Sequence, residues 1–161
     1  MDTTFKKQGF KVVRDFYNIH EHTEKNPDLY QYLISSKHLA IMDSQVPDAE
    51  AFYNNVELCK MHINSISRME KETGLKLYPT YVYARIYNPK SILEKHRDRP
   101  SCEISVTVNI GFDGKYSWPI CIQDFEGNDH SVTLNPGDGL IYHGCELTHW
   151  REPADSRVNN H

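Results

Sequence analysis

The sequence lacks the segments that direct a chain into or across a membrane. No run of roughly eighteen or more apolar residues, the minimum for a membrane-spanning helix, occurs among its 161 residues. The first seven residues, 1–7, also lack the apolar core of a secretory signal peptide. We therefore expect no membrane partner and a cytoplasmic location.

Closely spaced cysteine pairs are lacking too. The chain has four cysteines, and no two of them form a Cys-x-x-Cys pair: Cys59, Cys102, Cys121 and Cys145. A zinc ribbon or a thioredoxin-type redox motif would need such a pair. We expect four reduced thiols, most of them packed inside the protein.

No part of the chain concentrates positive charge. The 18 lysines and arginines are scattered, and 22 acidic residues bring the net charge to −4. Proteins that bind nucleic acids usually gather basic residues on one surface, so we expect no nucleic-acid partner. A hydrophobic content of 39% and a charged content of 25% are ordinary for a globular protein, and they predict a single domain over 1–161.

The first part of the chain, 1–76, is predicted to be mainly helical. A short strand is expected at Phe10–Arg14. A helix is expected to begin near Asn26-Pro27, where a capping residue precedes a proline, and to run through Leu29, Tyr32 and Leu33.

A second helix is predicted from about Asn55 to Thr73. Gly74 follows it at the position where a C-cap glycine belongs. Apolar residues recur in it every three or four positions, and we expect this stripe to pack on a sheet. The stripe consists of Val56, Cys59, Ile63, Ile66 and Met69.

The second part, 77–161, is predicted to consist of strands and turns. Apolar and polar residues alternate in five short segments, which are 81–87, 103–110, 118–123, 130–134 and 140–142. Glycine, proline, asparagine and aspartate separate these segments, as expected of turns. Helices followed by many short strands indicate an α+β fold, with helices packed on one face of a curled double sheet.

Three side chains in the second part can meet at one metal ion. His96 and Asp98 are two residues apart, so on an extended segment they project to the same side. His149 follows the glycine turn 135–139 and the apolar run 140–142, which predict a return of the chain toward the same place. Two imidazoles and one carboxylate are the ligand set of non-haem Fe(II) centres.

Two other histidines compete with His149 for the third ligand position. His143 directly follows the apolar run, and His130 stands near the start of a predicted strand. We favour His149 because the segment 144–148 has room to leave the sheet and return, and because Trp150 would give the imidazole a rigid neighbour.

Together these segments resemble the Fe(II)/2-oxoglutarate-dependent dioxygenases, most of all their prolyl-4-hydroxylase-like branch. The resemblance rests on five segments in a fixed order: 83–87, 96–99, 103–109, 134–138 and His149. It covers about Leu77 to Arg157. It implies a double-stranded β-helix, or jelly roll, with N-terminal helices packed on its major sheet.

The resemblance also implies the cofactors and the residues that hold them. His96, Asp98 and His149 would bind Fe(II), and 2-oxoglutarate, O₂ and ascorbate would serve as co-substrate, oxidant and auxiliary reductant. Members of the family usually hold the far carboxylate of 2-oxoglutarate with an arginine or lysine located after the distal histidine. Arg157 lies eight residues beyond His149 and is one candidate, and Arg151 and Arg99 are substitutes for it. Tyr87 and Arg85 are further expected to line the co-substrate pocket.

The activity that the resemblance implies is hydroxylation of a substrate, with release of succinate and CO₂. The substrate itself is left open between a prolyl peptide, an amino acid and a small metabolite, and the oligomeric state is also open. Two alternatives remain. One is a cupin-like protein that binds a metal or small ligand. The other is a degenerate oxygenase fold that serves as an interaction module.

Overall fold

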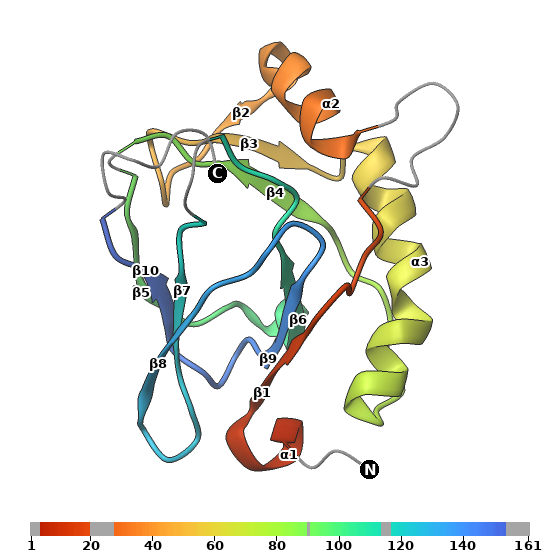
Figure 1. The fold of residues 1–161 in the computed structure, drawn as a ribbon, viewed down its shortest axis with the longest axis vertical. Coiled ribbons are helices and arrows are strands. Elements are labelled where there is room, and N and C mark those ends of the chain that lie inside the picture. The colour runs from red at the N-terminus through yellow and green to blue at the C-terminus, as the bar shows by residue number, and fades with distance from the viewer. Residues whose placement is uncertain (1–3, 20–27, 90, 114–116, 154–161) are drawn as a thin grey trace.

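The computed structural model describes residues 4–19, 28–89, 91–113 and 117–153, which form a mixed α/β molecule with antiparallel sheets (Figure 1). Its helices are α1 (Thr4–Gln8), α2 (Leu29–Ser35) and α3 (Val56–Thr73), with short 3-10 helices η1 (Lys37–Leu39) and η2 (Pro100–Cys102). Its strands are β1 (Phe10–Val13), β2 (Ile41–Met42), β3 (Glu50–Tyr53), β4 (Tyr83–Ile86), β5 (Leu93–His96), β6 (Ile104–Val108), β7 (Ile120–Gln123), β8 (Asp129–Val132), β9 (Gly139–His143) and β10 (His149–Arg151).

Two of the three sheets face each other. One has the strand order β1-β9-β6 and the other has the order β5-β10-β7-β8. Both contribute to one buried apolar cluster: Phe10, Ile120, Ile122, Leu134, Leu140, Tyr142 and Leu147. Buried and half-buried residues alternate along β7, so one face of that strand points into the cluster. Residues 139–142 of β9 are all buried, because its other face packs against α3.

The third sheet, with the order β2-β3-β4, lies above the other two in Figure 1, beside α2. Phe52 of β3 and Ile86 of β4 pack in one cluster with apolar residues of α2 and α3. Farther along α3, Met69 packs with Val13 of β1 and Ile141 of β9. The long helix therefore supports both the third sheet and the sheet of β1, β9 and β6.

Helix α3 begins and ends as its sequence predicts. The side chain of Asn55 accepts a hydrogen bond from the backbone of Glu57, and Gly74 adopts the left-handed conformation at φ 73°. The face that it buries was predicted wrongly. The buried residues are Leu58, Met61, Ser65, Met69 and Thr73.

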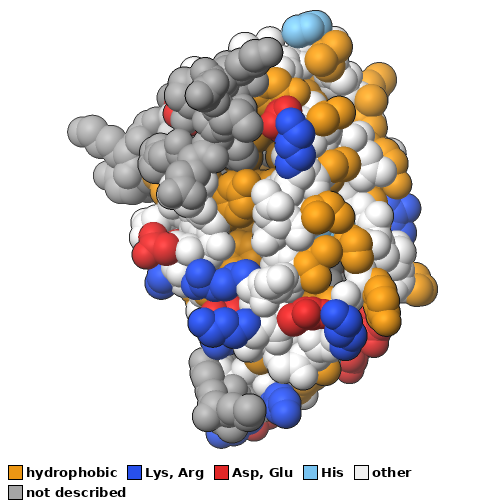
Figure 2. All heavy atoms as spheres, turned by 90° about the vertical axis from the view of Figure 1, so that its right-hand side faces the viewer, with side chains coloured by type: hydrophobic (Ala, Val, Ile, Leu, Met, Phe, Trp, Pro, Cys, Tyr) orange, Lys and Arg blue, Asp and Glu red, His pale blue; other side chains and the backbone are white. Residues whose placement is uncertain are grey.

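Most of the predicted stripe on α3 instead faces outward. Val56 is 66% exposed and Ile63 is 54% exposed, and of the five predicted residues only Met69 is buried. On this side of the molecule hydrophobic side chains are interspersed with polar ones (Figure 2). Both stripes have helical spacing, so periodicity alone could not tell which one the core would use.

Two other features of the first part differ from the prediction. Helix α2 starts at Leu29 with Asp28 as its N-cap, whereas Asn26 and Pro27 lie outside the described residues. The sequence analysis also missed α1 and the strands β2 and β3. In the part of the chain that the structure describes, no helix combines the length and apolar character needed to span a membrane.

Candidate metal centre

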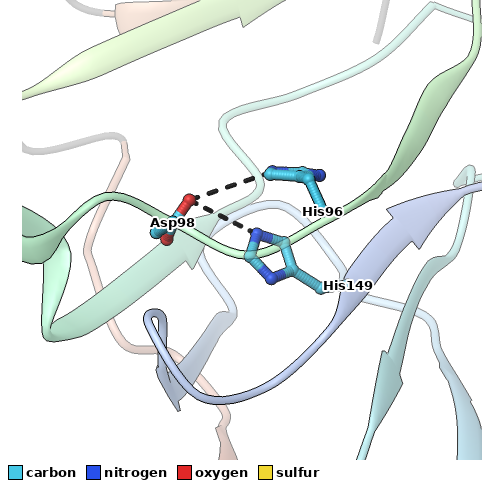
Figure 3. A group of neighbouring side chains, drawn as sticks. All are labelled: His96, Asp98 and His149. Carbon is cyan, nitrogen blue, oxygen red and sulfur yellow. Dashed lines mark ion pairs between the residues drawn. The ribbon is translucent and has the colours of Figure 1, made fainter.

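Two neighbouring strands of one sheet, β5 and β10, bring His96, Asp98 and His149 together (Figure 3). His96 is the last residue of β5, and His149 is the first residue of β10. These strands are antiparallel neighbours in which the two histidines stand directly opposite each other. Asp98 follows β5 by two residues, so its side chain returns to the same side as that of His96.

The three side chains point their ligand atoms at one place. Oδ1 of Asp98 lies 3.8 Å from Nε2 of His96 and 3.5 Å from Nε2 of His149, and the three ligand atoms lie within 4.8 Å of one another. An ion bound at about 2 Å from each atom fits between them. The geometry therefore suits one metal ion with three protein ligands.

Backbone carbonyls fix the orientation of both imidazoles. Nδ1 of His96 lies 2.8 Å from the carbonyl of Glu94, and Nδ1 of His149 lies 3.0 Å from that of Leu147. A carbonyl oxygen can only accept a hydrogen bond, so each Nδ1 carries the proton and each Nε2 keeps its lone pair for a metal.

The electrostatics favour the protonation states that bind a metal. Burial lowers the pKa of His96, and the neighbouring His149 lowers it further. Burial alone would raise the pKa of Asp98, but hydrogen bonding and charge from a protonated His149, a hydrogen bond from Ser105 and the charge of a protonated His96 hold it below its usual value. When both imidazoles are neutral, the hydrogen bond from Ser105 still lowers it. Neutral imidazoles and an ionised carboxylate are the forms that coordinate a metal.

The two competing histidines lie in other environments. His143 stacks on Phe5 at 4.8 Å between ring centroids, and its Nδ1 lies 3.1 Å from a carboxylate oxygen of Glu146. His130 lies 2.8 Å from the carboxylate of Asp124 in the turn between β7 and β8. Neither belongs to the group of ligand atoms around Asp98.

A buried arginine lies on the same strand as His149. Arg151 is only 5% exposed, and its guanidinium lies 5.5 Å from the ring centre of Tyr87 and 5.0 Å from that of Trp118. It donates a hydrogen bond to the backbone carbonyl of Trp118. Among the described residues, no carboxylate forms an ion pair with it. Burial lowers the pKa of Arg151, because an interior shielded from water disfavours the charged guanidinium. No carboxylate among the described residues balances this charge.

The other residues predicted to hold a co-substrate are placed differently. Arg85 already forms an ion pair with Asp43, and it also donates hydrogen bonds to Gln45 and Tyr87. Arg99 is exposed and lies over the ring of Tyr81. Arg157 lies outside the described residues. Tyr87 is buried against Trp118 beside Arg151, and its role in holding a co-substrate stays a prediction.

Sequence reasoning gave too little weight to one polar side chain of the interior. Tyr142 is buried on β9, with its ring 4.7 Å from that of His149 and its hydroxyl 3.4 Å from that of Thr107. Burial and the charge of Asp98 raise the pKa of Tyr142, so its hydroxyl stays protonated and can donate a hydrogen bond. In the sequence Tyr142 reads only as part of an apolar run, because its position opposite β6 is not written there.

Of the comparisons with known proteins, the one with solved structures found matches. No protein-family model matches the chain, and no curated protein matches it. Among solved structures, a Pseudomonas putida prolyl-4-hydroxylase matches 98% of this chain and 91% of its own, with a TM-score of 0.70 and 14% identity. HygX from Streptomyces hygroscopicus, with nickel and 2-oxoglutarate bound, matches 97% of this chain and 81% of its own, with a TM-score of 0.70 and 11% identity.

A third structure, that of OsALKBH1, matches 94% of this chain and 87% of its own, with a TM-score of 0.62 and 14% identity. The chain shares the fold of the Fe(II)/2-oxoglutarate-dependent dioxygenases. The resemblance predicted from the sequence is thereby confirmed for the fold. Within this dioxygenase fold, the donor set of His96, Asp98 and His149 suits Fe(II), because two neutral imidazoles and one carboxylate leave coordination positions open.

Proposed function

We propose that the protein is an Fe(II)- and 2-oxoglutarate-dependent dioxygenase that hydroxylates a small molecule or a peptide. The support is the dioxygenase fold together with three ligand side chains directed at one place. On this proposal the two facing sheets are the halves of a double-stranded β-helix. Nucleic acids and membranes are not among its expected partners.

The observation that carries the proposal is the unbalanced charge of Arg151. Among the residues that the structure describes, no carboxylate pairs with this buried guanidinium, which is costly, and a bound anion would relieve that cost. Arg151 and His149 are two residues apart on β10, which places them roughly 7 Å apart along extended backbone. A five-carbon dicarboxylate can bridge this span, with its 2-oxo acid end at the metal and its far carboxylate at Arg151. A guanidinium can hold that carboxylate by two parallel hydrogen bonds.

The residues of this chain then have separate roles. His96, Asp98 and His149 hold the metal, which together with 2-oxoglutarate and O₂ supplies the oxidising power and releases succinate and CO₂. Arg151 orients the co-substrate, and the rings of Tyr87 and Trp118 keep water from the guanidinium.

Anaerobic titration of the Fe(II)-loaded protein with 2-oxoglutarate tests the proposal. We expect a visible metal-to-ligand charge-transfer band, which forms only when the 2-oxo acid chelates the iron. Asp98→Ala should abolish metal binding and the band. Iron binding by the wild type without any band would exclude the oxygenase and leave a metal-binding protein with this fold.

Replacement of Arg151 tests its role separately. Arg151→Met should keep iron binding but weaken 2-oxoglutarate binding by about 100-fold or more, because a charge-assisted bidentate contact is lost. Arg97→Met is the matched control, since Arg97 is an exposed arginine whose side chain hydrogen-bonds Thr148. Equal binding by Arg151→Met and the control would show that another residue holds the carboxylate.

A further inference from the structure

The two carboxylate oxygens of Asp98 have different surroundings. Oδ1 faces the Nε2 atoms of His96 and His149 at 3.8 and 3.5 Å (Figure 3). Oδ2 accepts a hydrogen bond of 3.0 Å from the hydroxyl of Ser105. The same hydroxyl lies 3.3 Å from the carbonyl oxygen of Cys102. One oxygen is therefore directed at the metal site and the other is held by the protein.

The group that holds Oδ2 comes from the sheet opposite the two histidines. Ser105 lies on β6, whereas His96 and His149 lie on β5 and β10. The backbone of Asp98 is fixed at the same place, because its amide donates a 2.8 Å hydrogen bond to the carbonyl of Gly144, just after β9. The ends of β6 and β9 thus determine the orientation of the Asp98 carboxylate.

We propose that Ser105 is a positioning residue that keeps Asp98 a monodentate ligand. The inference rests on the proposed function, because it requires that the three side chains bind a metal. One atom from each of three residues leaves three positions open on a six-coordinate ion. If both carboxylate oxygens of Asp98 bound the ion, only two coordination positions would stay open, and a chelating co-substrate would fill both. Ser105 therefore preserves the position at which a second small molecule can bind.

A matched pair of variants isolates the hydroxyl. Ser105→Thr keeps a hydroxyl and adds a methyl group, whereas Ser105→Val has the same shape without the hydroxyl, and both residues suit a strand. Ser101→Ala is the control, because it removes an exposed hydroxyl from the segment that precedes β6. The probe is Co(II) alone, titrated into each metal-free protein and followed by the visible absorption of the bound ion.

We expect Ser105→Val to raise the Co(II) dissociation constant by about 10- to 100-fold, because loss of a hydrogen bond that orients a metal ligand has effects of this size. Its cobalt spectrum should also change, since Oδ2 becomes free to bind. Ser105→Thr and Ser101→Ala should keep both the affinity and the spectrum of the wild type.

Three outcomes separate the proposals. Failure of the wild type to bind Co(II) would overturn the proposed function and this inference together. Tight binding by the wild type with an unchanged constant and spectrum in Ser105→Val would overturn the inference alone. An equal loss in Ser105→Thr and Ser105→Val would also overturn it, because the effect would then be steric. Circular dichroism of the metal-free variants verifies folding, and Ser105→Ala replaces Ser105→Val if the latter does not fold.

Discussion

Gly144 has no side chain, and its neighbours leave no space for one. A Cβ atom at this position would lie 2.3 Å from the carbonyl oxygen of Cys102, 2.6 Å from Oδ2 of Asp98 and 2.8 Å from the hydroxyl of Ser105. Two of these three atoms belong to the metal ligand and to the residue that orients it. The close approach of the backbone is therefore part of how Asp98 is placed.

We expect Gly144→Ala to weaken metal binding by at least about tenfold, because the added methyl group displaces the carboxylate of Asp98. Gly127→Ala is the control. Gly127 has a positive φ of 88° and open space around it, so alanine there should cost about 1 kcal/mol of stability through backbone strain and leave metal binding intact. Isothermal titration with Co(II) measures the difference, and equal affinities would contradict the prediction.

Asp43 is the carboxylate that neutralises Arg85. Burial alone would raise the pKa of Asp43, but hydrogen bonds from Arg85, the backbone of Gln45 and Tyr83, together with the charge of Arg85, bring it below 3.8. A carboxyl group with a lowered pKa in the folded state stabilises the fold above its unfolded pKa of 3.8. This stabilisation is lost as the pH falls through the lower, folded value.

Asp43→Asn should therefore lower the free energy of unfolding at pH 7 by about 1.5–3 kcal/mol, the usual range for hydrogen bonds to a charged group. The deficit should shrink as the pH falls below 3.8, because the wild type then loses the same charge. Urea unfolding of both proteins at several pH values measures this. A deficit that is independent of pH would show that the charge of Asp43 does not stabilise the fold.

Helix α3 offers a direct test of which of its two apolar stripes supports the core. Met61 is 7% exposed and packs in the cluster shared with β3 and β4, whereas Ile63 is 54% exposed. We expect Met61→Ala to cost about 2–5 kcal/mol and Ile63→Ala to change stability by less than about 0.5 kcal/mol. Chemical denaturation of the two variants makes the comparison, and a larger loss for Ile63→Ala would refute the assignment of the buried face.

Binding of 2-oxoglutarate, whose far carboxylate we propose is held by Arg151, should stabilise the molecule as a whole. With iron bound, 2-oxoglutarate at a hundredfold excess over its dissociation constant should add about 2.7 kcal/mol and raise the melting temperature by roughly 5–10 °C. Arg151→Met should lack this shift. The variant without ligand should be as stable as the wild type or more so, because replacement of a buried charge by an apolar side chain is often stabilising. Differential scanning calorimetry measures both effects.

The sequence predicts those parts of the fold that depend on local patterns. The strands β4, β6, β7, β8 and β9, both ends of α3 and the spacing of His96 and Asp98 follow from alternation, capping residues and side-chain direction, whereas β5 and β10 were not predicted as strands. The meeting of His149 with this pair follows from the resemblance and from a turn, and the structure brings the three together.

Features that depend on distant contacts could not be read in this way. The strands β2 and β3 lie in a segment without clear alternation, and they form because β2 pairs with β3 and β3 pairs with β4. The burial of Arg151 depends on Tyr87 and Trp118, which are far from it in the sequence. The roles of Ser105 and Gly144 appear only once β6 and β9 are placed beside Asp98.

The pairing of β1 with β9 has a consequence for how the protein is made. Phe10 stands opposite Tyr142 and Val13 opposite Gly139, so β1 pairs with a strand that is synthesised well over a hundred residues later. At ordinary rates of translation the first strand waits on the order of ten seconds for its partner. Phe10 and Val13 are buried in the folded protein, but during that time the strand that covers them is missing and their side chains are exposed to water. We therefore expect the nascent chain to depend on chaperones that shield this segment until β9 has been synthesised.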